Sequence, residues 1–294
     1  MSRKIWQTLE RVNGLAAVTA EWQALLASDY EAFRKFLRPT SQHATCYPCL
    51  ATPPCGCAHE VIIHAPNDIV AVCRCEPQDC ETTAVQRQDL VIYEVNLGAL
   101  GESIASTLGL VRDNTVVADL RRTLRVGTYC PLPGYRVPVY LTIQLEPDDF
   151  QRVVETLVVD NDEPFVLLAP TQELFSPACE KRLQKRKAQF LPLADTLAWQ
   201  QDGTLIPRVP PEALLSGMQK AMIPPVQVSY DEIPSPESCF ILQGHYWSVT
   251  YQGKTCSLKD AKGMGYLEIL LRKQGHCKSA CKTDQVFGVI GVQN

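Results

Sequence analysis

The chain has 294 residues, of which 46% are hydrophobic and 20% charged, and its formal net charge is −4. This composition excludes disorder as the main state, and the length leaves room for several modules. The acidic balance excludes binding of nucleic acid by the charge of the whole molecule. No apolar run reaches the roughly 18 residues of a membrane helix, and the chain does not open with the apolar core of a signal peptide, so we expect a cytoplasmic protein with no membrane partner.

The first segment, residues 1–42, is predicted to be helical. Apolar residues recur at helical spacing from Ile5 to Val12, and the following Asn-Gly pair ends that helix. A second helix is expected to start after Thr19, to carry aromatic and apolar side chains on one face, and to end at Pro39. We expect this face to cover the neighbouring module.

Cysteine is the unusual component of the sequence. There are 13 cysteines, and seven of them lie between Cys46 and Cys80. In a reducing compartment such a cluster is typical of metal ligands rather than of disulfides. We therefore expect residues 43–85 to bind zinc, with one site and a possible second. The candidate ligands are Cys46, Cys49, Cys55, Cys57, His59, Cys73, Cys75 and Cys80.

The order of these residues resembles a zinc ribbon. Cys46 and Cys49 enclose Tyr-Pro, which resembles the turn of a zinc knuckle, and the second pair of ligands is expected from Cys73, Cys75 and Cys80. Residues 60–64 and 68–73 are predicted to form a hairpin between the two knuckles. The spacing leaves open which four residues form each site. A second zinc could use Cys55, Cys57 and a histidine, or the spare thiols could be unliganded.

The sequence favours a structural rather than a catalytic metal. The H-x-E and P-C-x-x-C motifs of the cytidine deaminases are both absent, since Glu60 follows His59 directly. A catalytic zinc keeps one coordination position open and takes histidine or carboxylate ligands in most cases. The thiol-rich surroundings therefore predict a closed site.

Residues 86–222 are predicted to form an α/β module. Its expected strands are 89–95, 124–130, 137–145 and 164–169, and its expected helices are 98–109, one opened by Pro147 and one capped by Ser176-Pro177. This alternation predicts a mixed or partly parallel sheet. Gly98 and Gly101 follow the first strand, where we expect close packing of helix on sheet rather than phosphate binding, because Glu102 would repel an anion.

A proline-rich linker, residues 223–238, is expected to lead to a C-terminal module, residues 239–294. From Tyr246 to Gly275 the sequence resembles the front half of a winged-helix domain of the response-regulator type: a hairpin with Gly-Lys at its turn leads to a helix that ends in Gly. The later recognition helix of that family has no counterpart here, and residues 286–292 are expected to form a strand. The resemblance implies a fragment used for packing or partner contact.

Two groups of basic residues are candidates for nucleic-acid contact, although a solvated basic face is favoured for the first. They are Lys181, Arg182, Lys185, Arg186 and Lys187 in the central module, and Lys259, Lys262, Arg272 and Lys273 in the C-terminal module. Between Cys46 and Cys80 four acidic residues face a single base, Arg74, so any phosphate contact is not expected in the metal module.

The sequence as a whole predicts an α+β protein of several modules. The function that it favours is a zinc-stabilised, non-enzymatic adaptor or regulator that acts through a protein partner. One alternative is a DNA-binding regulator that uses the C-terminal module. Another is an enzyme of unidentified chemistry, with Cys130 or Cys179 as nucleophile and His245 or His276 as base, but no spacing joins these residues and no small-molecule substrate is indicated.

Overall fold

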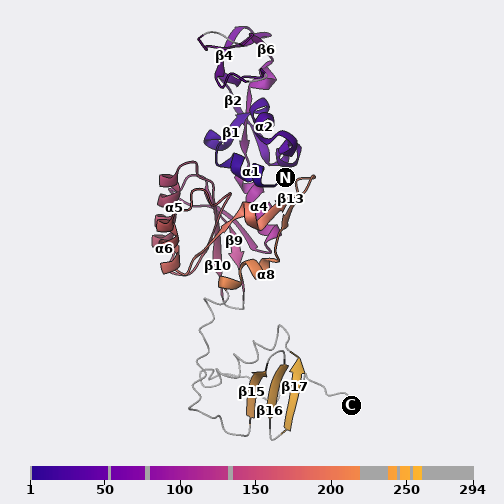
Figure 1. The fold of residues 1–294 in the computed structure, drawn as a ribbon, viewed down its shortest axis with the longest axis vertical. Coiled ribbons are helices and arrows are strands. Elements are labelled where there is room, and N and C mark those ends of the chain that lie inside the picture. The colour runs from indigo at the N-terminus through magenta and orange to yellow at the C-terminus, as the bar shows by residue number, and fades with distance from the viewer. Residues whose placement is uncertain are drawn as a thin grey trace. The chain divides into compact units, whose positions relative to one another are not determined.

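The computed structural model describes residues 2–51, 54–76, 80–131, 135–218, 238–243, 246–251 and 254–259. The chain divides into two units, Met1–Pro224 and Pro225–Asn294. Both helices and sheets are present, as the α+β prediction requires (Figure 1). Within the described residues, no helix combines the length and the apolar character that crossing a bilayer requires.

The first unit is built on a five-stranded sheet in the order β12-β11-β10-β9-β8. Its strands are β8 (Val111–Val116), β9 (Thr123–Tyr129), β10 (Val137–Thr142), β11 (Val166–Ala169) and β12 (Gln189–Pro192). The pairs β8–β9 and β9–β10 are antiparallel, whereas the pairs β10–β11 and β11–β12 are parallel. The predicted mixed sheet is confirmed, although its edge strands β8 and β12 are not among the predicted strands and the strand predicted at 89–95 belongs to a separate three-stranded sheet.

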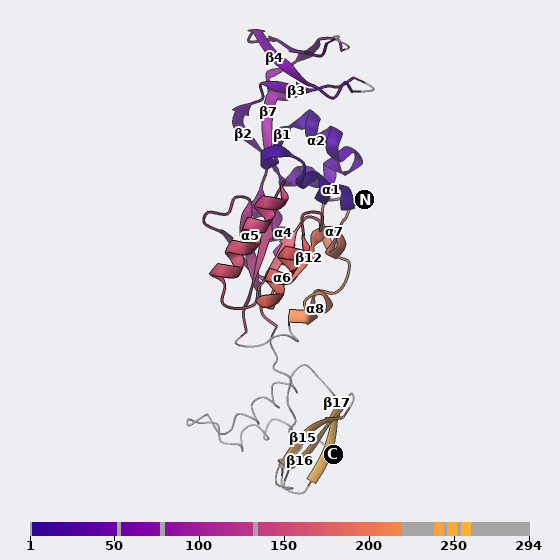
Figure 2. The same ribbon diagram turned by 60° about the vertical axis from the view of Figure 1, so that its left-hand side comes forward.

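Helices cover both faces of this sheet. α5 (Pro147–Asp160) and α6 (Pro177–Lys185) connect the parallel strands and lie side by side on one face (Figures 1 and 2). In β11 the side chains alternate between two cores, so that Leu167 packs with α5 and α6 while Leu168 packs on the opposite face. The Ser176 hydroxyl caps α6 by accepting from the Cys179 amide, as predicted.

On the opposite face α4 (Leu97–Thr107) packs against β8 and β9. The core on this side continues into the N-terminal helices α1 (Ser2–Leu9), α2 (Thr19–Leu26) and α3 (Tyr30–Phe33). Their aromatic side chains meet at Trp199, whose ring centroid lies 5.2 Å from that of Trp6. The Trp22 indole donates to the Tyr93 carbonyl oxygen at 3.0 Å. The expectation that the aromatic face covers the neighbouring module is confirmed.

The prediction that residues 1–42 are helical is wrong at two places. β1 (Ala16–Val18) and β2 (Leu37–His43) lie on either side of β7 (Val91–Val95) in a three-stranded antiparallel sheet. The helical stretch ends at Phe36, and Pro39 lies inside β2. β2 is an edge strand, where the missing N–H of a proline need not break a hydrogen bond of the sheet.

The cysteine-rich segment forms an insertion between β2 and β7, which are themselves paired. The two strands close at His43↔Val91, and the Ala44 amide donates to the Leu90 carbonyl oxygen at 2.8 Å. Between these points lies a four-stranded antiparallel sheet of β3 (Cys46–Pro48), β4 (Ala58–Ala65), β5 (Asp68–Val72) and β6 (Thr83–Val85). The hairpin predicted between the cysteine groups is confirmed as β4 and β5.

The glycine-containing junction before α4 is a packing contact. A Cβ on Gly101 would lie 2.9 Å from Leu124 Cδ1 and 3.1 Å from Val126 Cγ1, both on β9. A larger residue at this position would therefore require the Leu124 and Val126 side chains to shift. The helix therefore approaches the sheet as closely as the sequence predicted.

Short elements complete the first unit: the 3-10 helices Asn13–Leu15, Ala27–Asp29, Arg34–Phe36 and Arg87–Leu90, the helices α7 (Leu193–Thr196) and α8 (Pro211–Leu214), and the strands β13 (Leu197–Trp199) and β14 (Leu205–Pro207). In the second unit β15 (Ser238–Gln243), β16 (Tyr246–Tyr251) and β17 (Lys254–Lys259) form an antiparallel sheet. The predicted hairpin is β16–β17, and β15 was not predicted.

Nearly all of the linker 223–238, the helix expected before Gly275 and the strand 286–292 lie outside the described residues.

The two-sided packing of the sheet can be tested at Leu168, which has no exposed surface. We expect Leu168→Ala to lower the free energy of unfolding by about 2–5 kcal/mol, because the cavity cannot collapse between two packed layers. Val159→Ala on α5, where the side chain is 73% exposed, should change it by less than about 0.5 kcal/mol. Urea unfolding followed by circular dichroism compares the two, and equal effects would contradict a buried central strand.

Candidate metal centre

The alternation of side chains across the inserted sheet decides which cysteines meet. Tyr47 pairs with His59, and Glu60 pairs with Val72. If the β4–β5 register is continued by one residue beyond the last pair, His59 falls opposite Cys73, and by three residues Cys57 falls opposite Cys75. Because side chains two residues apart share a face, these residues project on the same side of the sheet.

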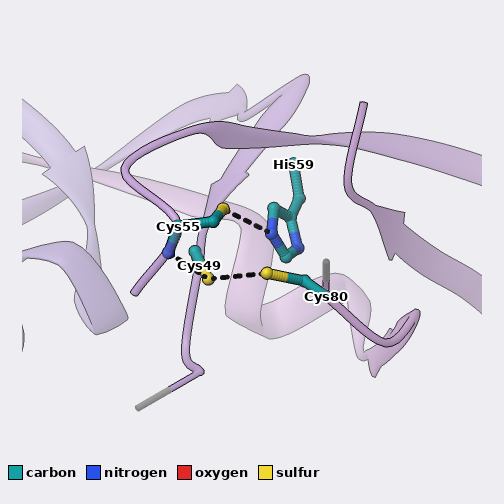
Figure 3. Close-up of side chains that lie close together, drawn as sticks. All are labelled: Cys49, Cys55, His59 and Cys80. Carbon is teal, nitrogen blue, oxygen red and sulfur yellow. Dashed lines mark hydrogen bonds between the residues drawn. The ribbon is translucent and has the colours of Figure 1, made fainter. Parts of the chain in front are cut away.

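The first group of donors consists of Cys49, Cys55, His59 and Cys80, whose ligand atoms all lie within 4.8 Å of one another. Figure 3 shows the His59 ring beside the three thiols. The Sγ atoms of Cys49 and Cys80 are 3.6 Å apart, and Cys55 Sγ lies 3.7 Å from His59 Nε2. A tetrahedral zinc with bonds of about 2.3 Å to sulfur and about 2.0 Å to nitrogen separates two sulfurs by about 3.8 Å and a sulfur from a nitrogen by about 3.6 Å. The donor set therefore fits a tetrahedral ion.

His59 is buried beside these thiols. Its side chain is only 2% exposed, and within the described part of the chain its Nδ1 atom is buried without a hydrogen-bond partner. An unsatisfied buried polar atom costs about 1–3 kcal/mol. A metal bound at Nδ1 would compensate this cost, whereas a metal bound at Nε2, the nitrogen that lies 3.7 Å from Cys55 Sγ, would not.

Backbone amides prepare two of the thiols for coordination. The Cys55 amide donates to Cys49 Sγ at 3.5 Å, and the Cys75 amide donates to Cys73 Sγ at 3.4 Å. Hydrogen bonds from the Cys55 and Ala51 amides lower the pKa of the Cys49 thiol to about 6, and the Cys75 amide lowers that of Cys73. Metals bind thiolates, so these amides favour the binding form.

Other thiols of the cluster are held in the protonated form by their neighbours. Contacts with Cys57 and Cys73 raise the pKa of Cys75, and contacts with Cys55 and Cys49 raise that of Cys80 to about 12. Several thiolates cannot form together in so small a volume without a compensating charge. A divalent cation reverses this preference, because a coordinated thiol loses its proton.

The structure also forms a second group, Cys55, Cys57 and Cys75, which shares Cys55 with the first. The Sγ atoms of Cys57 and Cys75 are 2.8 Å apart, and Cys73 Sγ lies 3.9 Å from Cys55 Sγ. Seven of the eight predicted ligands are thus brought together at one end of the inserted sheet.

The expected knuckle pair Cys46 and Cys49 is not brought together. Cys46 lies in β3 opposite Glu60, on the face that also carries the 2.7 Å ion pair between Glu60 and Arg74. Cys49, directly after the end of β3, reaches the cluster, whereas strand alternation turns Cys46 to the other face. The prediction took this segment for a turn, in which both thiols would converge.

The other candidate residues are dispersed. On α6 and just after it, Arg182 pairs with Glu155 at 2.8 Å and Arg186 pairs with Asp162 at 3.7 Å, while Lys181, Lys185 and Lys187 are exposed. Lys259 is exposed at the end of β17, whereas Lys262, Arg272, Lys273, His245 and His276 lie outside the described residues. Cys130 is exposed, and Cys179 is buried with its sulfur 3.3 Å from the Ser176 hydroxyl.

Comparison with known proteins adds no relative: the chain matches no protein-family model, no curated protein and no solved structure. The site therefore has to be interpreted from its own geometry. All of its ligand types were found in the sequence, but their grouping depends on the strand alternation. That information was present in the sequence, since Cys57, His59, Cys73 and Cys75 flank the two predicted strands at even spacings.

The grouping predicts a difference between the two cysteines of the C-x-x-C motif. We expect Cys49→Ser to lower metal bound per chain, with an affinity loss greater than the about 10–100-fold typical of changes outside the ligand shell. Cys46→Ser should retain the metal content of the unchanged protein, because Cys46 lies on the other face. Plasma mass spectrometry of both purified variants gives the answer, and metal loss in Cys46→Ser would restore the knuckle interpretation.

The thiol environments predict the pH dependence of alkylation in the metal-free protein. Because the pKa of Cys49 is lowered to about 6, its thiolate is present above that pH and should react with iodoacetamide at pH 7. Cys80, with its pKa raised to about 12, stays protonated and should react slowly at the same pH. Peptide mass mapping after brief alkylation at pH 5, 7 and 9 measures both rates, and faster reaction at Cys80 would contradict the assigned environments.

Proposed function

We propose that the chain is a zinc-stabilised, non-enzymatic adaptor whose inserted module contacts a protein partner. The observation that carries the proposal is the first donor group: three thiols and one imidazole, from Cys49, Cys55, His59 and Cys80, around one point. Four protein donors complete a tetrahedron, and no coordination position is left for water or substrate. Closed sites of this kind are structural in known zinc proteins.

Zinc is the metal that this donor set favours. Thiolate and imidazole are soft or borderline ligands, and a tetrahedral arrangement of sulfur with nitrogen is typical of Zn²⁺. Calcium and magnesium take oxygen ligands instead, so they do not suit a site of three sulfurs.

The inserted module has a reason to depend on a metal. Its own buried core is small and consists of Val18, Tyr47, Ile69, Ala71, Val85 and Leu90. Two of these residues, Val18 and Leu90, lie outside the four-stranded sheet. So few apolar side chains contribute too little to hold four short strands, and small modules of this size commonly use a metal in place of a core. Binding and folding of the module are therefore expected to be coupled.

Partner contact is supported by the place of the module in the chain and by its surface. The module is an insertion between the paired strands β2 and β7, and long insertions of this kind commonly serve recognition. It exposes two large apolar side chains, Leu50 at 53% and Ile63 at 65%. Its charges are mainly acidic, with Glu60, Asp68, Glu76 and Asp79 against Arg74, which suits a protein partner better than a phosphate backbone.

The proposal is tested by affinity capture from cells, with zinc measured on the same eluate and one half treated with nuclease. We expect a protein partner that survives nuclease, that is lost with Ile63→Glu, and that is retained with Val159→Glu. Val159 is the matched control because it is a branched side chain of similar exposure, 73%, on α5. Ile63→Glu should keep its zinc, so that loss of the partner reports the surface.

Three results would contradict the proposal. Absence of zinc from the eluate would remove the structural site. A partner that disappears with nuclease would favour the nucleic-acid alternative, and charge reversal of the exposed Lys181, Lys185 and Lys187 would then be the next variant to make. Retention of the partner by Ile63→Glu would show that the surface around Ile63 on β4 does not contact the partner.

A further inference from the structure

The second donor group adjoins the first. Cys57 precedes β4 and Cys75 follows β5, and both lie within 4.8 Å of Cys55 when their sulfur atoms are compared. Cys73, which lies opposite His59 in the extended ladder, has its sulfur 3.9 Å from that of Cys55. Cys55 therefore stands between two sets of donors.

We propose that the module holds two divalent metal ions joined by the Cys55 thiolate. One ion is held by Cys49, Cys55, His59 and Cys80, and the other by Cys55, Cys57, Cys73 and Cys75. The inference rests on the proposed zinc site and adds a second ion and a bridging ligand to it.

The number of donors supports the bridge. Two tetrahedral ions require eight ligand positions, while the cluster offers seven side chains, six thiols and His59. One bridging thiolate supplies the missing position. Each of Cys57, Cys73 and Cys75 lies against another sulfur of the cluster. If the first ion alone were bound, these three thiols would have no metal to coordinate.

The geometry of the second group is close to that of a tetrahedral site. The 3.9 Å between Cys55 Sγ and Cys73 Sγ matches the about 3.8 Å expected between two zinc-bound sulfurs. The Cys75 amide donates to Cys73 Sγ, an interaction that favours a thiolate there. Cys57 and Cys75 are closer, at 2.8 Å. Because Cys57 is exposed, its side chain can rotate and lengthen the distance between the Cys57 and Cys75 sulfurs to about 3.8 Å, the value expected for two zinc-bound sulfurs.

Binding of the two zinc ions balances in charge and requires no oxidant or reductant. Each of the six thiols releases one proton to solvent when it binds, so two Zn²⁺ ions and six thiolates give a centre of net charge −2. Nothing is oxidised or reduced. This residual charge is smaller than that of six free thiolates, and the Cys55 and Cys75 backbone amides already donate to the Cys49 and Cys73 sulfurs.

The decisive measurement is the metal content of the full chain, purified under reducing conditions, by native mass spectrometry. We expect two zinc ions per chain. After replacement by ¹¹³Cd, the NMR spectrum should contain two resonances that are split by coupling through the shared Cys55 sulfur. One ion, or two resonances without coupling, would overturn the bridged centre. One ion would leave the proposed zinc-stabilised adaptor intact, whereas no ion would remove both proposals.

Variants separate the two sites. Cys75→Ser should keep one ion, Cys55→Ser should lose both, and Cys46→Ser, the matched control, should keep two. If Cys55→Ser fails to fold, the cadmium spectrum of the unchanged chain still decides the question. A disulfide between Cys57 and Cys75, found by peptide mass mapping of the freshly purified protein together with a single ion, would overturn the second site.

Discussion

The two-residue period of the β3–β4–β5 ladder is the constraint on which the candidate site depends. It gathers the side chains of His59 and Cys73 on one face and turns that of Cys46 to the other, where Glu60 and Arg74 form an ion pair. The gathered sulfurs would repel one another as thiolates, and amide hydrogen bonds relieve this at Cys49 and Cys73. In the proposed centre a cation would compensate the charge of the crowded thiolates. The sheet thus sets the positions of the candidate ligands, and the proposed metal would stabilise those positions.

The rest of the first unit does not share this dependence. Its five-stranded sheet is buried on both faces, by α5 and α6 on one side and on the other by α4 and the core that α4 shares with the N-terminal helices. The inserted module has a core of six residues and takes part of that core, Val18 and Leu90, from its surroundings. Within one unit, therefore, stability has two sources: apolar burial in the main layers and, in the proposed centre, metal–thiolate bonds in the insertion.

The sequence was informative where a pattern has a single structural meaning. Pro147 and Ser176 begin helices, the buried run before residue 170 is a strand, and Gly101 lies where α4 packs closely on β9. The site was less predictable, because C-x-x-C has two meanings: in a turn its thiols converge, and in a strand they diverge. β2 is not predicted because Pro39 is typical of a helix end, although an edge strand tolerates it. The charge pattern of residues 181–187 does not predict that Arg182 pairs with Glu155 and Arg186 with Asp162.

The topology of the insertion gives the metal a local role in the proposed function. β2 and β7 close the neck of the module through His43↔Val91 and the hydrogen bond from Ala44 to Leu90. If the module unfolded on metal loss, β2 and β7 would remain paired, because they belong to a separately stabilised core. A partner surface that includes Ile63 would then be present with metal and absent without it, while the main sheet is unchanged. In such an arrangement metal binding would stabilise the recognition surface and leave the stability of the rest of the chain unchanged.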